Sequence, residues 1–349
     1  HGVRPSLMEQ HGSKESDPRL EKETHMPKAI VVEETGSPSV MKWRDIEIGR
    51  PAKGEVTVRA RAIGVNFIDI YQRAGLYPMP LPFTPGGEMC GEIEAVGAGV
   101  TGFKIGDRVA TGTAGAGCYA EIRNIDAGLL VKVPREISDD TAAAMMLQGM
   151  TVQFLIRQVY KVSKGDTILI HAAAGGVGLI LCQWAKALGA TVIGTVGSPG
   201  KARLAKAHGC DYPIIYSREN FVDRVRKITK GAMVPVVYDS IGKGTFPASL
   251  DCLQQRGLFV TFGNASGPIP PFDPAILAQK GSLMMTRPTL FHFADTPENM
   301  RKMAGDVMKM IKSGDVKIEV NHKYSLREAA RAHRDLAARK TTGSIILEP

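Results

Sequence analysis

The stretch His171-Ala172-Ala173-Ala174-Gly175-Gly176-Val177-Gly178 joins an apolar run, 167–171, to a run with helical character, 177–188. Gly189 ends that second run, and a further apolar stretch, 191–196, follows at once. A strand, a glycine-rich turn, a helix and a second strand form a βαβ unit, which is the building block of parallel sheets. The sequence therefore predicts an α/β domain around residues 171–178.

Within this stretch, Ala173-x-Gly175-x-x-Gly178 matches the dinucleotide-binding fingerprint, with alanine in the place of the first glycine. Gly175 would let the backbone approach a pyrophosphate, and Gly178 would let the helix pack closely on the strand. The helix N-terminus would then face the anion. A tight turn in any α/β protein can look the same, but the flanking strand and helix favour the cofactor interpretation.

The residues after the second strand bear on which nicotinamide cofactor binds. NAD sites usually carry an acid about 20 residues after the fingerprint, to bind the ribose 2′-hydroxyl. Here that position falls on Thr195, in a segment without acids, and Lys201 follows. A lysine can neutralise a 2′-phosphate, so the sequence favours NADP(H); the alternative is an ordinary solvated charge at a helix start.

The rest of the chain falls into three patterns. Residues 26–149 carry short strand-like runs broken by frequent glycines, which predicts a small barrel whose strands are not long. From about residue 150 strands and helices alternate, with further strands expected at 234–238, 258–262 and 282–286. The last sixty residues predict a helix from Thr296 to about Gly314, a second helix opened by the capping box at Ser325, and a final strand at 345–347.

Composition excludes several protein classes. The chain has 349 residues, 44% hydrophobic and 23% charged, which suits two globular domains. Its net charge of +9 permits anionic ligands, including nucleic acid. No apolar run is long enough to span a membrane, and the five cysteines form no disulfide framework or C-x-x-C pair. We expect a cytoplasmic protein without a metal site, and we interpret residues 1–25 as a tag, vector remnant or disordered extension.

Motifs spread over residues 26–349 resemble the medium-chain dehydrogenase/reductase superfamily, in its zinc-free quinone oxidoreductase (zeta-crystallin-like) branch, and are similar to bacterial NADPH:quinone reductases. They are the fingerprint turn, Asn66-Phe67-Ile68-Asp69-Ile70-Tyr71, Gly75-Leu76-Tyr77-Pro78, Pro85-Gly86-Gly87-Glu88-x-x-Gly91, Phe103-Lys104-Ile105-Gly106-Asp107-Arg108-Val109, Tyr238-Asp239-Ser240-Ile241-Gly242, Phe262-Gly263-Asn264 and Thr286-Arg287-Pro288. Gly87 stands where zinc-dependent relatives carry a metal-binding histidine, so the resemblance implies no zinc. It also implies no flavin.

The resemblance implies a Rossmann domain with a doubly wound parallel sheet, residues 150–289, inserted into a GroES-like β-barrel catalytic domain, residues 26–149 and 290–349. It also implies the residues that bind NADP(H). Those expected along the pyrophosphate, ribose and 2′-phosphate are Thr151, Gly175, Gly176, Val177, Gly197, Ser198, Lys201, Tyr216, Ser240, Phe262, Gly263, Asn264 and Arg339. Asn66 and Arg287 are expected at the nicotinamide end.

The activity implied by the resemblance is direct, zinc-independent hydride transfer from NADPH to a quinone between the two domains. Asn66, Tyr71 and Tyr77 are the residues expected to orient the quinone, and Arg287 is expected to stabilise developing negative charge. An obligatory general acid is not required, since quinol oxygens can take protons from water.

Two other functions stay open at this point. The first is reduction of the double bond of an enone or enal, which would need Tyr71 or Tyr77 as a proton donor. The second is RNA binding by the basic surface, although the sequence has no RNA-binding signature. Relatives commonly form homodimers through an edge strand, which predicts a dimer contact around residues 282–286.

Overall fold

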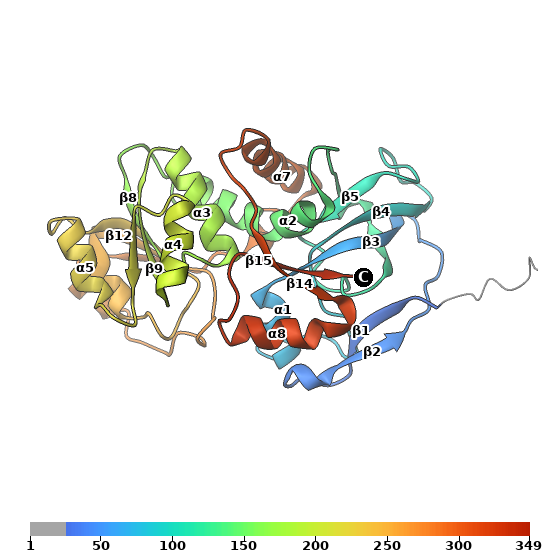
Figure 1. Ribbon diagram of the computed structural model, residues 1–349, viewed down its shortest axis with the longest axis horizontal. Coiled ribbons are helices and arrows are strands. Elements are labelled where there is room, and N and C mark those ends of the chain that lie inside the picture. Colours follow the sequence, from blue (N-terminus) through green and yellow to red (C-terminus); the bar gives the residue numbers. More distant parts are fainter. Residues whose placement is uncertain (1–25) are drawn as a thin grey trace, which may run out of the picture.

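The structure, a computed structural model, describes residues 26–349 and contains two main sheets at opposite ends of an elongated molecule (Figure 1). The proposed extension, residues 1–25, lies outside the described residues. Strands β8 to β13 form one sheet, and strands from both ends of the chain form the other. The arrangement confirms the expected fold class, a Rossmann domain joined to a GroES-like barrel.

The six-stranded sheet is parallel throughout, in the order β10-β9-β8-β11-β12-β13. Its strands are β8 (Thr167–Ile170), β9 (Thr191–Val196), β10 (Tyr212–Ile215), β11 (Val234–Asp239), β12 (Leu253–Thr261) and β13 (Met284–Thr286). Its helices are α3 (Gly176–Ala187), α4 (Pro199–Ala207), α5 (Phe221–Ile228) and α6 (Ala275–Gln279). The strand order reverses direction between β8 and β11, which is where doubly wound sheets bind ligands.

The second sheet has the order β14-β15-β3-β4-β5-β7, with β6 paired to β3. Its strands are β3 (Glu55–Val65), β4 (Met89–Val96), β5 (Arg108–Thr111), β6 (Ile122–Asp126), β7 (Val131–Lys132), β14 (Val320–Ser325) and β15 (Ser344–Glu348). A separate ribbon pairs β1 (Lys28–Val32) with β2 (Met41–Asp45). Because β15 pairs with β3, the two ends of the chain complete one domain around the inserted Rossmann domain.

The expectation of uniformly short strands in residues 26–149 was wrong, because β3 has 11 residues. Its Gly64 is not a break. An alanine methyl group there would lie 2.3 Å from the carbonyl oxygen of Ala143, so the glycine lets a helix cross the strand closely. The same segment also contains two helices, α1 (Phe67–Ala74) and α2 (Asp139–Phe154).

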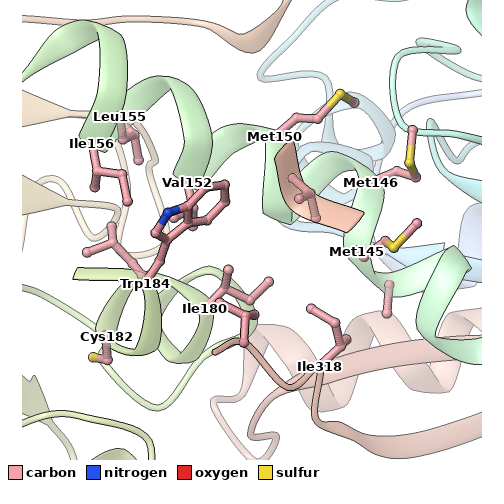
Figure 2. Close-up of a cluster of buried hydrophobic side chains, with 14 of the residues drawn as sticks. Met145, Met146, Met150, Val152, Leu155, Ile156, Ile180, Cys182, Trp184 and Ile318 are labelled. Atoms are coloured by element: carbon pink, nitrogen blue, oxygen red, sulfur yellow. The ribbon is translucent and has the colours of Figure 1, made fainter. Parts of the chain in front are cut away.

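Helix α2 is buried along most of its length and forms the core between the domains. Figure 2 shows Met145, Met146 and Met150 from α2 on one side of this core, with Ile180 and Trp184 from α3 close by. Almost every residue after its first turn is buried, so its sequence lacks the one-sided period of a surface helix. A π-helical turn, Leu155–Val159, continues it.

Helices α7 (Pro297–Lys312) and α8 (Ala329–Ala337) match the two helices expected near the C-terminus. Helix α7 packs on α2, where a methyl group at Gly149 would lie 2.6 Å from Val307. The exact domain limits of 149/150 and 289/290 stay a prediction, and α2 runs across the first of them. In residues 26–349 we find no helix that is both long enough and apolar enough to cross a membrane.

Candidate active site

The fingerprint turn lies at the carboxyl end of β8 and opens helix α3. Gly175 is the N-cap of α3, and no side chain caps this helix end, so its first N–H groups can receive an anion. A methyl group at Gly178 would lie 2.2 Å from the carbonyl oxygen of Ala172. Gly175 has no such contact closer than 3.4 Å. Gly178 is therefore required for packing, whereas Gly175 leaves space beside the turn.

The alanine in place of the first glycine is accommodated by the neighbouring strand. Ala173 is fully buried, and a methyl group at Gly194 of β9 would lie 2.6 Å from its Cβ atom. Gly194 thus provides the volume that the first glycine of the motif usually provides. The departure from the fingerprint does not disturb the turn.

The residues expected around a 2′-phosphate meet beyond the end of β9. The ammonium group of Lys201 donates to the carbonyl oxygen of Arg339 over 2.7 Å. Burial, and then the nearby charge of Arg339, lower the pKa of Lys201. In the described part of the chain neither cation forms a salt bridge. Two neighbouring cations without an acidic partner are suited to a phosphate dianion.

Helix α4 and the end of β10 complete this corner. Ser198 is the N-cap of α4, and its hydroxyl accepts from the backbone N–H of Lys201. Tyr216 is 45% exposed, and a methyl group at Gly197 would lie 2.9 Å from its hydroxyl oxygen. The absence of a side chain at Gly197 therefore lets the Tyr216 ring approach the end of β9. The structure brings four predicted residues together here: Gly197, Ser198, Lys201 and Tyr216.

A buried polar network holds the loop that carries Ser240. His171 contacts the hydroxyl groups of Thr195 at 2.8 Å and Ser249 at 2.9 Å. The carboxylate of Asp239 accepts from the backbone N–H groups of Ile241 and Gly242. These bonds fix the turn after β11 beside the fingerprint turn.

The turn after β12 packs against the same loop. The N–H of Phe262 donates to the carbonyl oxygen of Asp239 over 2.8 Å. A methyl group at Gly263 would lie 2.5 Å from the carbonyl oxygen of Ser240. The two turns that carry Ser240, Phe262 and Gly263 thus lie side by side, as the sequence motifs predict.

Four predicted residues from distant parts of the sequence form one hydrogen-bonded cluster. The backbone N–H of Asn264 donates to the hydroxyl of Tyr71 over 2.9 Å. Arg287 donates to the hydroxyl of Tyr77 over 3.0 Å. The amide of Asn264 satisfies its partners when its oxygen accepts from Tyr77 and Arg287 and its nitrogen donates to Gly263. Helix α1 is thereby joined to the ends of β12 and β13.

The two tyrosines of this cluster differ in burial: Tyr71 is buried and Tyr77 is half-buried. Tyr71 is 8% exposed and packs edge-on against Tyr77, with ring centroids 5.2 Å apart. Burial raises the pKa of Tyr71 to about 12. Its hydroxyl accepts from Asn264 and keeps its proton at neutral pH, so that proton is available as a hydrogen-bond donor.

Asn66 and Thr151 lie nearby on different elements. Asn66 caps helix α1, is 5% exposed, and donates to Glu88 over 2.7 Å. Thr151 of α2 donates its hydroxyl proton to the carbonyl oxygen of Leu147, which leaves its oxygen able to accept. Of the remaining predicted residues, Val177 lies in the first turn of α3, directly after Gly176.

Two family models match this chain. The model described as alcohol dehydrogenase GroES-like domain matches residues 52–135, and the model described as zinc-binding dehydrogenase matches residues 176–305. A quinone oxidoreductase of Pseudomonas aeruginosa is 54% identical over 325 residues, which cover 93% of this chain and 100% of that protein. The chain belongs to the quinone oxidoreductase family.

Solved structures of relatives resemble this chain over nearly its whole length. Escherichia coli quinone oxidoreductase complexed with NADPH superposes with a TM-score of 0.91 at 45% identity, covering 92% of this chain and 100% of that one. A 2-haloacrylate reductase of a Burkholderia species is 43% identical over 332 residues, covering 93% of this chain and 99% of that protein. The family therefore includes proteins named for two different acceptors.

Gly87 is the position at which the family resemblance implies a zinc ligand in zinc-dependent relatives. A methyl group at Gly87 would have no neighbour closer than 3.6 Å. Across residues 26–349, three or more His, Cys, Asp or Glu side chains nowhere gather in a way that could hold a metal ion.

Sequence reasoning missed the buried carboxyl groups behind the site. Burial raises the pKa of Asp69 to about 7 and that of Glu88 to about 8. Asp69 accepts from the hydroxyl of Tyr119, which also contacts His333 over 3.0 Å. Glu88 and Asp69 both belong to motifs that the sequence analysis quoted, but only the fold shows that they are fully buried and lie beside Asn66.

Proposed function

We propose that this protein transfers a hydride from NADPH to a quinone bound between the two domains. The observation that carries the proposal is the cluster of Tyr71, Tyr77, Asn264 and Arg287, which joins the barrel domain to the Rossmann domain. The 54% identity to a quinone oxidoreductase supports the same conclusion. NADPH, when bound, supplies the hydride.

The residues present fit NADPH. The uncapped N-terminus of α3 and the open space at Gly175 suit the pyrophosphate. Lys201 and Arg339 lie close together and neither pairs with an acid among residues 26–349, which suits the 2′-phosphate. Gly197, Ser198 and Tyr216 would line the adenosine ribose, and Ser240 with the turn 262–264 would follow the pyrophosphate path. Thr151, Val177 and Gly176 would complete the site around the first turn of α3.

At the other end, the chain's own groups would hold the acceptor. Tyr71 keeps its hydroxyl proton and can donate it as a hydrogen bond to a quinone oxygen. Tyr77 and Arg287 stand next to it, and the guanidinium stabilises negative charge that develops on that oxygen. Asn66 would hold the nicotinamide ring opposite them. A planar, electrophilic acceptor needs mainly this alignment, and water can protonate the quinol.

The purified protein tests this proposal directly. With NADPH and a panel of ortho- and para-quinones, we expect turnover well above the rate without protein. NADPH binding without turnover of any quinone would contradict the acceptor class while leaving the cofactor in place. A chelator is expected to leave the rate unchanged.

A second candidate is reduction of a carbon–carbon double bond next to a carboxylate or carbonyl group. Two observations favour it: the 43% identity to a 2-haloacrylate reductase, and the guanidinium of Arg287, which forms no salt bridge within residues 26–349. Such a reaction needs a proton donor at the α-carbon, and Tyr71 or Tyr77 would supply it. If Arg287 binds a carboxylate, Arg287→Met lowers kcat/KM for 2-chloroacrylate far more than for an uncharged quinone.

The assembly and location belong to the same proposal. We expect a homodimer that pairs β13, the edge strand of the six-stranded sheet, where Met284 is 54% exposed. All five cysteines are unpaired thiols, which supports a reducing compartment such as the cytoplasm. The molar mass in solution, measured by light scattering, tests the dimer.

A further inference from the structure

A chain of four buried side chains runs behind the proposed nicotinamide site. Asn66 donates from its amide nitrogen to Glu88 Oε2 over 2.7 Å, and Gln148 donates to the amide oxygen of Asn66 over 3.1 Å. Ser344 donates its hydroxyl proton to Gln148 Oε1 over 2.9 Å. None of these four residues is more than 7% exposed. Asn66 is the N-cap of α1, Glu88 directly precedes β4, Gln148 belongs to α2 and Ser344 to β15, so the chain crosses the interior of the barrel domain.

The hydrogen bonds of this chain all run in one direction, and Glu88 sets that direction. Glu88 Oε1 accepts from the backbone N–H of Leu147 over 2.9 Å. Backbone donors cannot be reversed, so this oxygen must accept. Above the pKa of about 8, where Glu88 is ionised, the other oxygen can only accept, and it accepts from Asn66, which turns the Asn66 amide oxygen towards Gln148.

The far end of the chain reaches the fingerprint turn. A methyl group at Gly176 would lie 2.1 Å from Gln148 Oε1, so this amide oxygen lies directly against the first residue of α3. Next to it, the backbone N–H of Gly343 donates to the carbonyl oxygen of Ala174 over 3.0 Å. Gln148 therefore touches both Asn66 and the turn that would hold the pyrophosphate.

We propose that Glu88 and Gln148 are positioning residues that couple the two ends of the cofactor site: Glu88 fixes the orientation of the Asn66 amide, and Gln148 carries that orientation to the turn at Gly176. The inference rests on the proposed NADPH-dependent function. Neither residue touches the acceptor in this account. Their effect is to hold Asn66 and the pyrophosphate turn in one fixed arrangement before the cofactor binds.

Glu88→Gln, assayed at about pH 9 where the wild-type carboxyl is ionised, tests the direction of the chain with almost no change in volume. The new amide keeps its oxygen on the Leu147 N–H, so its nitrogen faces the Asn66 nitrogen, and Asn66 and Gln148 must both rotate or lose a bond. We expect the Kd for NADPH to rise about tenfold and kcat with 1,4-benzoquinone to fall about tenfold. The melting temperature and circular dichroism show whether the variant is folded.

The double variant Glu88→Gln with Asn66→Asp separates positioning from a general loss of structure. The carboxylate at position 66 accepts from the new amide and from Gln148, so Gln148 returns to its native orientation. We expect the Kd for NADPH to return to within about threefold of wild type while kcat stays low, because the Asn66 donor is gone. A merely structural role for Glu88 would not produce this split.

Gln148→Met probes the other half of the chain, with Gln153→Met as its control. Gln153 is a buried amide on the same helix, bonded to Asp306 and Gln158, and it does not contact Asn66. We expect only Gln148→Met to weaken NADPH binding.

If folded Glu88→Gln and Gln148→Met both bind NADPH within twofold of wild type, the coupling is wrong. If wild-type protein binds NADPH but reduces no quinone, the Kd measurements still decide the inference, whereas wild type that does not bind NADPH overturns the proposed function too.

Discussion

The backbone N–H of Asn264 donates to the Tyr71 hydroxyl across 2.9 Å, although the two residues are 193 positions apart in the sequence. One belongs to the turn after β12 in the Rossmann domain and the other to helix α1 of the barrel domain. The bond uses a lone pair of the Tyr71 oxygen and leaves its proton free. The same contact that joins the domains therefore orients the donor that would face an acceptor.

Lys201→Ala is expected to weaken NADPH binding and leave NADH binding unchanged. A charged hydrogen bond contributes about 1.5–3 kcal/mol, so KM for NADPH is expected to rise about 10- to 100-fold. Lys206→Ala on the same helix is the control, because Lys206 is exposed at the opposite end of α4. Steady-state kinetics with both cofactors measures the effect. Equal losses with NADPH and NADH would contradict a 2′-phosphate contact.

Alanine at two glycines of the fingerprint is expected to have different effects, one on NADPH affinity and the other on stability. Gly175→Ala has room for its methyl group in the protein, so we expect a near-normal melting temperature but a much weaker affinity for NADPH. Gly178→Ala places a methyl group 2.2 Å from a backbone oxygen, so we expect the melting temperature to fall by more than about 5 °C. Thermal melts with and without NADPH distinguish them. A stabilising effect of NADPH on Gly175→Ala as large as on wild type would refute the pyrophosphate assignment.

The variants Tyr71→Phe and Tyr77→Phe distinguish the two candidate reactions, quinone reduction and double-bond reduction. If the tyrosines only orient a quinone, each loss of a hydroxyl is expected to lower kcat by less than about tenfold. If one of them protonates an α-carbon, kcat on 2-chloroacrylate falls by about 100-fold or more in that variant. Tyr324→Phe is the control, because its hydroxyl bonds to Asp335 on α8. A large loss with quinones and none with 2-chloroacrylate would contradict both assignments.

The buried carboxyl groups predict how stability depends on pH. The pKa of Asp69 rises from its ordinary 3.8 to about 7 because of burial, so the folded protein holds a proton that the unfolded chain has released. The free energy of unfolding therefore falls as pH rises from about 4 towards about 7. We expect Asp69→Asn to show a shallower fall over that range in urea titrations. An identical slope in wild type and variant would show that Asp69 is ionised in the folded state.

The sequence predicted five of the six strands of the Rossmann sheet because each of them carries a local apolar signal, whereas β10, α5 and α6 were not predicted. The apolar strand 191–196 between Gly189 and Gly197 coincides with β9, and the helix after the fingerprint turn differs from α3 by one residue at each end. Each member of the four-residue cluster belongs to a motif quoted from the sequence, but Asn264 was expected along the ribose and pyrophosphate path and not beside the tyrosines. What the motifs could not show is that Asn264 bridges Tyr71 and Tyr77.

The barrel half was harder to predict for physical reasons. Frequent glycines predicted only short strands, yet the 11-residue strand β3 contains Gly64, where a side chain would collide with α2. Residues on every side of helix α2 are buried, polar ones included, so periodicity did not reveal it. The role of Glu88 depends on contacts with Asn66 and Leu147, which only the three-dimensional structure brings together.

NADPH-dependent quinone reduction is tested most simply by the rate of NADPH oxidation by 1,4-benzoquinone in the presence of the purified protein, compared with the rate using NADH. We expect protein-dependent turnover with kcat/KM for NADPH at least about tenfold above that for NADH, as a charged contact to the 2′-phosphate requires. Protein that binds NADPH tightly and yet does not accelerate the reduction of any quinone would contradict the central claim.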